Sequence, residues 1–296
     1  MKRLLLPAAM TALGLISACS SGAGPDAGPT PSEAATDAQG DAPAVQDSLS
    51  LSSTVTTIAF DAASTLPKAP ASARSQADCA GTVREPVSAA ARDVARAGWG
   101  VTGEGTVGAY QVISFAGSFE PGTSGSCYVG KGNLAVFDAG KLRAIAYARS
   151  GSETTIGRIE PFGKGDLRIW DGELLPQPIA DLRRTGKGLA IGKLASQERT
   201  CGGVVPGINE RPITQARKAL IAAGWKPVNH GAAEDRADER EKDLAKLGVI
   251  EVESCSGTGF GYCSFDYEQA GAALAVTTVG DNEDPSVADY AVKCRS

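Results

Sequence analysis

One stretch of this sequence occurs twice, and the repetition limits the folds available to the chain. Pro86–Trp99 (PVSAAARDVARAGW) and Pro212–Trp225 (PITQARKALIAAGW) both begin with proline and end with Ala-Gly-Trp. Their apolar residues recur at the spacing of one helix face, which predicts an amphipathic helix in each copy. Gly98 and Gly224 suit the left-handed position that ends a helix, and the tryptophan that follows can pack back over the apolar face. The sequence therefore predicts a duplicated helix-to-strand unit.

A second pair of similar segments supports the duplication. Leu134–Gly140 (LAVFDAG) is echoed by Leu274–Gly280 (LAVTTVG), and alternating runs typical of strands surround both. The expected fold class is therefore α+β, with two related units at residues 49–200 and 201–296. Each unit is expected to pack one helix on an antiparallel sheet.

Local patterns predict several further elements. Residues 49–60 are rich in β-branched residues and predict a strand, and Pro178–Arg184 predicts a short helix. Thr82–Glu85 has the form of a capping box at the start of the first helix. Ala232–Leu247 carries 10 charged residues among 16 and predicts a solvated surface helix, anchored by Leu244 and Leu247.

The N-terminus has the pattern of an export signal. Lys2 and Arg3 precede an apolar run that ends at Ile16, and small residues follow it. Such a run is too short to remain a membrane span and is typical of a secretory signal peptide, here residues 1–18. Residues 19–48 contain no lysine or arginine and few large apolar side chains, which predicts a disordered tether.

The sequence Ile16-Ser17-Ala18-Cys19 resembles the lipobox of bacterial lipoproteins. That resemblance implies that Cys19 is lipidated and becomes the mature N-terminus, and that Ser20 directs the protein to the outer membrane, facing the periplasm. An ordinary signal peptide with a chance cysteine is the alternative. Lipidation would anchor the chain to a membrane without a spanning helix.

The charge distribution argues against nucleic acid as a partner. Without residues 1–18 the chain keeps 27 basic residues against 34 acidic ones, a net charge of −7. Residues 79–200 are mildly basic, with 15 basic and 12 acidic residues, whereas residues 201–296 have 10 and 15. The basic segment is therefore suited to face either the acidic one or an acidic partner.

Six cysteines remain beyond Cys19, an even number that predicts disulfides in an exported chain. No close CxxC pair exists and His230 is the single histidine, so a structural zinc site is the weaker interpretation, and no cofactor is expected. The repeat suggests one pairing among the 15 possible: Cys79–Cys127, Cys201–Cys255 and Cys263–Cys294.

Catalytic patterns are weak in this chain. A nucleophile would have to rely on His230 as its base, and neither G-x-S-x-G nor S-x-x-K occurs. Glu251 and Glu253 are expected on one face of a strand, about 7 Å apart, as in an inverting glycosidase, although a strand with one wet face is the stronger explanation. Asp171 and Glu173 form another carboxylate pair.

Two glycine-rich runs were considered as binding sites. Gly103–Gly108 matches G-x-G-x-x-G, but a strand pattern follows it instead of the helix that a dinucleotide site requires. Gly257–Gly261, flanked by Cys255 and Cys263, is expected to form a rigid loop that could present Phe260 and Tyr262 to a ligand, and a plain turn is the stronger alternative.

Charged turns give two further candidates. Asp281, Glu283 and Asp284 could supply oxygens to calcium, but the EF-hand spacing is absent. Three glycine-flanked lysines would form a basic edge for an acidic partner if their turns cluster, and ordinary hairpin chemistry is the alternative. They are Lys131, Lys164 and Lys187.

The segment 204–228 resembles the opening of a PASTA domain, an extracellular module that packs one helix on a small sheet. The resemblance lies in Val205-Pro206-Gly207, Ala216–Leu220, Ala223-Gly224 and Lys226-Pro227-Val228. It implies contact with peptidoglycan.

The function predicted from these patterns is a non-catalytic envelope lipoprotein that acts as a periplasmic binding module. Its expected partners are the membrane, through the lipid, and an envelope protein or peptidoglycan. Two alternatives remain open: an enzyme-inhibitor or immunity lipoprotein, and an envelope hydrolase with a carboxylate pair.

Overall fold

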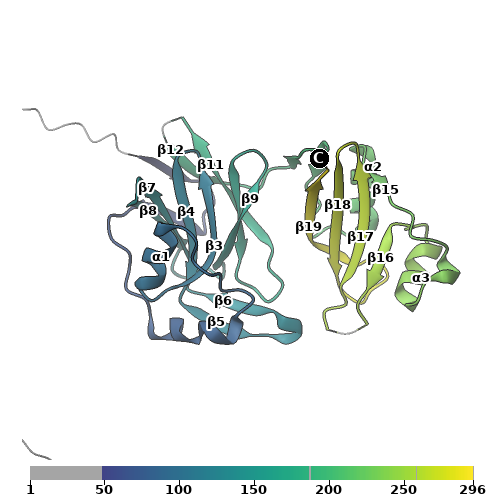
Figure 1. Ribbon diagram of the computed structural model, residues 1–296, viewed down its shortest axis with the longest axis horizontal. Coiled ribbons are helices and arrows are strands. Elements are labelled where there is room, and N and C mark those ends of the chain that lie inside the picture. Colours follow the sequence, from purple (N-terminus) through teal and green to yellow (C-terminus); the bar gives the residue numbers. More distant parts are fainter. Residues whose placement is uncertain (1–48, 187, 258, 296) are drawn as a thin grey trace, which may run out of the picture. The chain divides into compact units, whose positions relative to one another are not determined.

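The computed structural model describes residues 49–186, 188–257 and 259–295, and these are mostly β-structure (Figure 1). Strands make up 45% of the described residues and helices 16%. The expected α+β fold, with one helix on an antiparallel sheet in each unit, is therefore wrong. The predicted leader, Cys19 and the tether up to residue 48 lie outside the described residues.

Two five-stranded sheets face each other within residues 49–192. The first has the order β2 (Ile58–Ala62), β8 (Lys141–Ala148), β7 (Asn133–Asp138), β4 (Tyr110–Ala116) and β3 (Gly100–Val107). The second has the order β1 (Ser50–Ser53), β12 (Gly188–Gly192), β11 (Pro178–Thr185), β10 (Asp166–Asp171) and β9 (Ile156–Phe162). Only the β1–β12 pair in these two sheets is parallel. One apolar cluster joins the sheets, with Leu134 and Val136 from the first and Leu167 and Ile169 from the second.

The glycine run in β3 serves this sheet-to-sheet packing. A Cβ atom at Gly103 would lie 2.8 Å from the carbonyl oxygen of Ile159 in β9, and one at Gly105 would lie 2.5 Å from a methyl of Leu167. Only glycine permits so close an approach. The G-x-G-x-x-G match is therefore explained by packing, and a strand follows it as predicted.

Helix α1 (Ala89–Arg96) covers the other face of the first sheet, where Val94 packs near Trp99 and Phe115. Its N-cap is Ser88, whose hydroxyl accepts a hydrogen bond from the Ala91 N–H at 3.0 Å. The predicted capping box at Thr82–Glu85 is wrong, because the N-cap is Ser88, six residues after Thr82.

Smaller elements complete this part of the chain. They are the 3-10 helices η1 (Ala71–Cys79) and η2 (Thr123–Gly125) and the hairpin of β5 (Ser118–Pro121) and β6 (Cys127–Gly130). A disulfide between Cys79 and Cys127 joins η1 to β6.

A third five-stranded sheet lies within residues 226–294. Its strands are β15 (Lys226–Pro227), β16 (Val252–Cys255), β17 (Cys263–Gln269), β18 (Ala272–Val279) and β19 (Ser286–Cys294), and both β15 and β16 pair with β17. Helix α2 (Ile213–Ala222), the 3-10 helix η3 (Ala233–Asp235) and helix α3 (Glu239–Lys246) accompany it, and β13 (Gln197–Arg199) pairs with β14 (Val204–Pro206). Trp225, Phe265 and Tyr267 are the largest side chains of its core.

The predicted helix ends are confirmed in both copies of the repeat. Gly98 and Gly224 have φ values of 92° and 94°, and each donates its N–H three residues back. Trp99 and Trp225 donate theirs five residues back, the pattern of a Schellman motif. Their indole N–H groups each donate to an upstream backbone carbonyl, that of Pro67 and that of Val204, at 2.9 and 2.8 Å. Helix α3 ends in the same way at Gly248, with a φ of 85°.

Some of the elements predicted from local patterns are confirmed and others are wrong. The echoed segments, Leu134–Gly140 and Leu274–Gly280, are both strands followed by a left-handed glycine. Residues 49–60 form parts of two strands rather than one. The helix predicted at Pro178–Arg184 is wrong: this segment is β11, paired on both sides, because its alternate residues Ala180 and Leu182 belong to the core between the sheets.

Candidate functional site

The six cysteines form three disulfides, which confirms the predicted bonds but only one of the predicted pairs. Cys79–Cys127 is correct, whereas the other bonds join Cys201 to Cys294 and Cys255 to Cys263. The pairing of β16 with β17 explains the difference, since it places Cys255 directly opposite Cys263 with Cα atoms 4.1 Å apart. Residues 256–257 and 259–262, the described residues between these two cysteines, therefore belong to a short loop closed by a disulfide, hereafter the disulfide loop.

The disulfide loop is held by backbone hydrogen bonds as well as by its covalent closure. The Ser256 N–H donates to the Tyr262 carbonyl at 2.6 Å, and the Gly280 N–H donates to the Phe260 carbonyl at 2.9 Å. Gly259 and Gly261 have φ values of 74° and 65°, which favour glycine. The rings of Phe260 and Tyr262 meet edge to face, with centroids 6.0 Å apart, and both are half-buried.

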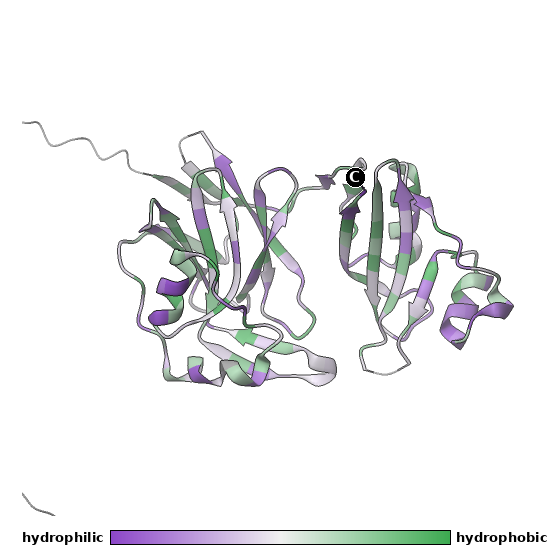
Figure 2. Cartoon of the chain, viewed as in Figure 1, coloured by the Kyte–Doolittle hydropathy of each residue, from purple (hydrophilic) through white to green (hydrophobic). Residues whose placement is uncertain are grey.

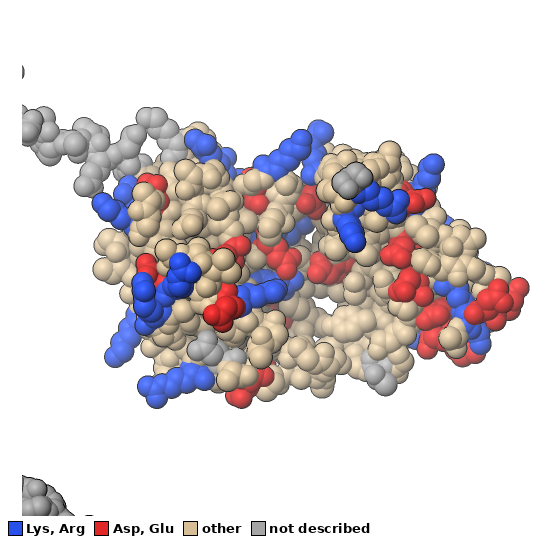
Figure 3. All heavy atoms as spheres, in the orientation of Figure 1, with Lys and Arg blue, Asp and Glu red and all other residues tan. Residues whose placement is uncertain are grey.

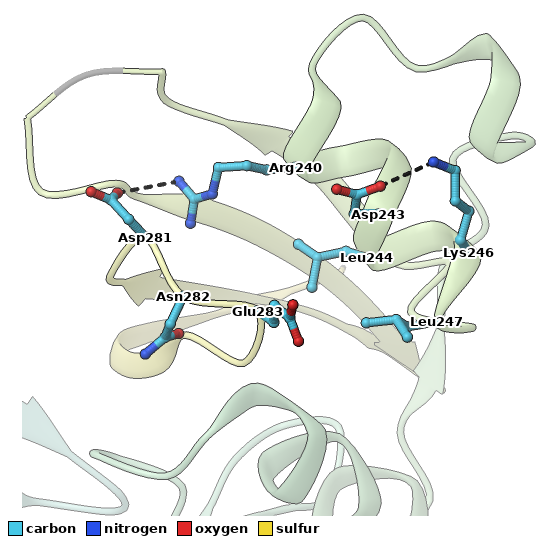
Figure 4. A pocket seen from close by; sticks show the side chains of 8 residues that line it. All are labelled: Arg240, Asp243, Leu244, Lys246, Leu247, Asp281, Asn282 and Glu283. Atoms are coloured by element: carbon cyan, nitrogen blue, oxygen red, sulfur yellow. Dashed lines mark hydrogen bonds and ion pairs between the residues drawn. The ribbon is translucent and has the colours of Figure 1, made fainter.

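Arg240 of α3 connects the disulfide loop to the β18–β19 turn. Its Nη2 donates to the carbonyls of Gly261 and Gly280 at 3.2 and 2.5 Å, and its Nη1 reaches the Ser256 carbonyl at 3.5 Å. Asp281 lies 3.9 Å from the same guanidinium (Figure 4). One guanidinium thus donates to three carbonyls, two in the disulfide loop and one in the β18–β19 turn. Hydrogen bonds from a charged donor are stronger than those between neutral groups.

Two further charged side chains join the η3–α3 segment to β16 and the residues just before it: Arg236, at the end of η3, and Glu241 of α3. Arg236 is 7% exposed and donates to the carbonyls of Val252 and Ile250. Glu241, 8% exposed, accepts the Cys255 N–H at 2.8 Å. Helix α3 is mainly hydrophilic (Figure 2), as expected of a solvated surface helix. The expectation that Leu244 and Leu247 anchor it is wrong in part. Charged groups also anchor it, and Leu247 is 65% exposed.

A groove of about 330 Å³ opens between α3 and the β18–β19 turn (Figure 4). Leu244 and Leu247 give it an apolar wall, and carboxylates stand around them. These are Asp243, Asp281 and Glu283. Asp243 is paired with Lys246 at 3.0 Å, and Arg240 is occupied by backbone carbonyls. Acidic side chains gather over α3, with basic ones among them (Figure 3). The groove therefore combines apolar surface with a rim of three carboxylates and two cations, Arg240 and Lys246.

The acidic turn does not form a calcium site. Both carboxylate oxygens of Asp284 are used by Thr214 at the start of α2: Oδ1 accepts its N–H at 3.0 Å and Oδ2 its hydroxyl at 2.6 Å. Asp281 is 83% exposed and turns toward Arg240. Across the described residues, no group of three or more His, Cys, Asp or Glu side chains is arranged to hold a metal ion.

The structure separates the carboxylates that were expected to act together. Glu251 is fully buried, and its Oε1 accepts from Arg217 Nε at 2.8 Å and from the Tyr267 hydroxyl at 2.7 Å. Glu253 is exposed, because a register shift between Val252 and Ser254 turns it out to solvent. The expectation that Glu251 and Glu253 share one face is therefore wrong.

His230 and Asp171 have structural partners. The Nε2 of His230 lies 3.1 Å from the Asp266 carboxylate. Asp171 Oδ1 accepts the N–H groups of Glu173 and Gln177, each at 3.1 Å, and so stabilises the turn between β10 and β11. Burial raises the pKa of Asp171, and these backbone donors act in the opposite direction.

Replacing Asp171 by asparagine should stabilise the protein more at pH 7 than at pH 4. The amide keeps the acceptor for the two N–H groups but carries no charge. The pKa of this carboxyl is lower in the unfolded chain than in the folded one. Ionisation therefore lowers the free energy of unfolding, fully so above the raised pKa of the folded state. Below the pKa of the unfolded chain, about 3.9, this loss of stability disappears. Urea unfolding of both proteins at the two pH values measures this, and an equal difference at both would contradict it.

The glycine-flanked lysines belong to different parts of the chain. Lys131, with a φ of 55°, lies between β6 and β7, and Lys164 lies in the β9–β10 turn between Gly163 and Gly165. Lys187 lies outside the described residues. No helix of the described part of the chain is long and apolar enough to cross a membrane.

Arg240 and Glu241 were not predicted from the sequence as parts of the site, whereas Leu244, Leu247, Asp281 and Glu283 were named for other roles. Arg240 and Glu241 stand one turn before Leu244, the single apolar position of α3 that is buried, and this spacing was the available signal. Comparisons with protein-family models, with curated proteins and with solved structures find no match to the chain.

Proposed function

We propose that this chain is a non-catalytic binding protein of the bacterial envelope, exported by its leader and anchored by a lipid on Cys19. Three disulfides are in keeping with an oxidising compartment. The tether up to residue 48 would let the folded part reach a partner away from the membrane.

The observation that carries this proposal is the set of bonds that hold the described part of the disulfide loop. The loop is closed by Cys255–Cys263, bonded to the β18–β19 turn through Phe260, and fixed by the guanidinium of Arg240. A loop held in this way loses little conformational entropy when it meets a partner, which favours binding. Catalysis has no comparable support in the arrangement, since Glu251 is occupied by Arg217 and Tyr267.

The groove beside the loop indicates the chemistry of the partner. Leu244 and Leu247 suit an aliphatic stem, and Glu283 makes no ion pair or hydrogen bond among the described residues. A lysine or arginine side chain has this composition, with an apolar stem and a cationic end. We therefore propose a partner protein that inserts a basic side chain between α3 and the β18–β19 turn.

Replacing Glu283 by lysine should weaken binding of that partner at least tenfold, because the new ammonium faces the incoming cation and the attraction of the carboxylate is lost. The full-length chain serves as bait in an envelope extract, and the captured protein is then titrated against both forms by calorimetry. Sedimentation with purified peptidoglycan is measured in parallel.

Glu120→Lys is the matched control, since it makes the same charge change on an exposed residue of β5 outside the groove. Its affinity should stay within about twofold of the unmodified chain. Equal weakening by both substitutions would show a general charge effect, and sedimentation with peptidoglycan in place of a captured protein would overturn the protein-partner proposal.

A further inference from the structure

Helix α1 leaves part of the outer face of the first sheet uncovered. The helix has eight residues and is about 12 Å long, whereas an eight-residue strand such as β8 spans about 26 Å. Ala144 and Ala146 of β8 point into the core between the sheets, so Tyr147 points to the outer face. Asn133 of β7 lies directly opposite Tyr147.

A hollow of about 500 Å³ occupies this uncovered region. Aromatic side chains line it: Tyr147 is 39% exposed, Tyr128 is half-buried, and Trp99 contributes an edge. The Tyr147 hydroxyl donates to Asp61 Oδ2 at 2.7 Å, which fixes the position of its ring. An exposed, fixed aromatic ring beside polar groups is typical of a ligand site rather than of a core.

Two cations stand at the same hollow, Lys131 and Arg149. The backbone next to Lys131 packs closely on β9, since a Cβ atom at Gly132 would lie 1.5 Å from the carbonyl oxygen of Ile156. The Lys131 side chain is positioned by a hydrogen bond, in which its Nζ donates to Ser72 Oγ at 3.1 Å. The Arg149 guanidinium makes no ion pair among the described residues, yet its charge reaches the phenol of Tyr147. Glu153 is the one acidic residue among the lining side chains.

Hydroxyl groups complete the lining, from Ser150, Ser152 and Thr154 on the loop after β8. Aromatic faces suit the C–H surface of a sugar ring, hydroxyls and an amide suit its hydroxyl groups, and the cations suit a carboxylate. We propose that this hollow binds an acidic saccharide, with its ring against Tyr147 and Tyr128 and its carboxylate at Lys131 and Arg149. The site is separate from the groove beside α3 and does not depend on the function proposed for it.

Calorimetry with the full-length chain tests the site. The first probe is trigalacturonate, and the second is the disaccharide of N-acetylglucosamine and N-acetylmuramic acid, so that a uronate and a cell-wall sugar acid are compared. The methyl ester of trigalacturonate keeps the rings but removes the charge. We expect one of the two acids to bind, and esterification or omission of the carboxylate to weaken binding at least tenfold.

Three substitutions connect binding to the hollow. Lys131→Asn, which suits the left-handed backbone, and Arg149→Gln should each raise the Kd about tenfold, and Tyr147→Ala should abolish detectable heat. Lys164→Asn is the matched control, because Lys164 is also flanked by glycines but lies outside the hollow, and it should change the Kd less than twofold. Near-UV circular dichroism verifies that each variant keeps its fold.

Absence of binding by both acids at millimolar concentration would overturn the proposal. Equal binding of the esterified trimer, or the same weakening by Lys164→Asn, would overturn the role given to the cations. An oligothymidylate that binds as tightly as the saccharides would instead assign the aromatic and basic groups to a nucleic acid.

Discussion

Replacing Trp225 by alanine should lower the free energy of unfolding by roughly 3–5 kcal/mol, the range for removal of a buried large aromatic side chain. Trp225 is 1% exposed and belongs to the core of the third sheet. Its indole fills the space beyond the end of α2 and donates to the Val204 carbonyl at 2.8 Å. The substitution therefore removes both a cavity-filling ring and a hydrogen bond. Urea unfolding followed by circular dichroism measures the loss.

Two further variants separate these contributions. Trp225→Phe keeps most of the apolar contact but removes the hydrogen bond. The lost hydrogen bond should lower the free energy of unfolding by about 1 kcal/mol, in addition to the loss from the smaller ring. Trp99→Ala removes the equivalent ring after α1, which packs edge to face on Phe115 with centroids 4.9 Å apart, and should destabilise about as strongly. A loss below about 1 kcal/mol for Trp225→Ala would contradict the role of this motif in the core.

Replacing Asp181 by alanine should destabilise the protein by roughly 3–5 kcal/mol, because the change leaves a buried cation without its partner. Asp181 is 0% exposed and lies opposite Arg168 across the β10–β11 pair. Its Oδ1 accepts from Arg168 Nε at 2.9 Å, and its Oδ2 accepts from Arg183 and from the Ala195 N–H. Arg168 itself is only 7% exposed in its side chain. Urea unfolding at pH 7 measures the change.

Two control variants test whether the burial of the Asp181 carboxylate determines this loss of stability. Asp166→Ala removes a carboxylate 3.3 Å from the same Arg183, but this pair is partly exposed and should cost less than about 1 kcal/mol. The double variant Arg168→Met and Asp181→Leu should recover most of the stability, since no buried charge is left unpaired. A similar loss for Asp166→Ala and Asp181→Ala would show that burial does not decide the strength of these pairs.

Local signals in the sequence predicted the parts of the fold that depend on local interactions. The ends of α1 and α2 followed from Ala-Gly-Trp, and strands such as β4, β7 and β18 followed from alternation. The fold class did not, because a second sheet covers the inner face of the first and no local pattern reports that packing. Pro178–Arg184 failed for the same reason, since its pairing with β10 and β12 overrides its helical pattern.

The candidate site depends still more on distant contacts. Arg240 looks like any charged residue of a surface helix, and its role appears only when Ser256, Gly261 and Gly280 lie around its guanidinium. The exchange of two disulfide partners has a similar cause, because the β16–β17 register decides which cysteines are adjacent. A loop between Cys255 and Cys263, in contrast, was predicted from its flanking cysteines, although their bond to each other was not.

Site-specific photocrosslinking in living cells tests the central claim most directly. A photoreactive amino acid at Asn282, which lines the groove, should give one protein adduct, and Glu283→Lys should abolish it. The same probe at Ile221, an exposed residue of α2 that is 42% accessible, is the control and should give no such adduct. An adduct that forms equally from Ile221, or one that Glu283→Lys leaves unchanged, would contradict a binding site at the disulfide loop and its groove.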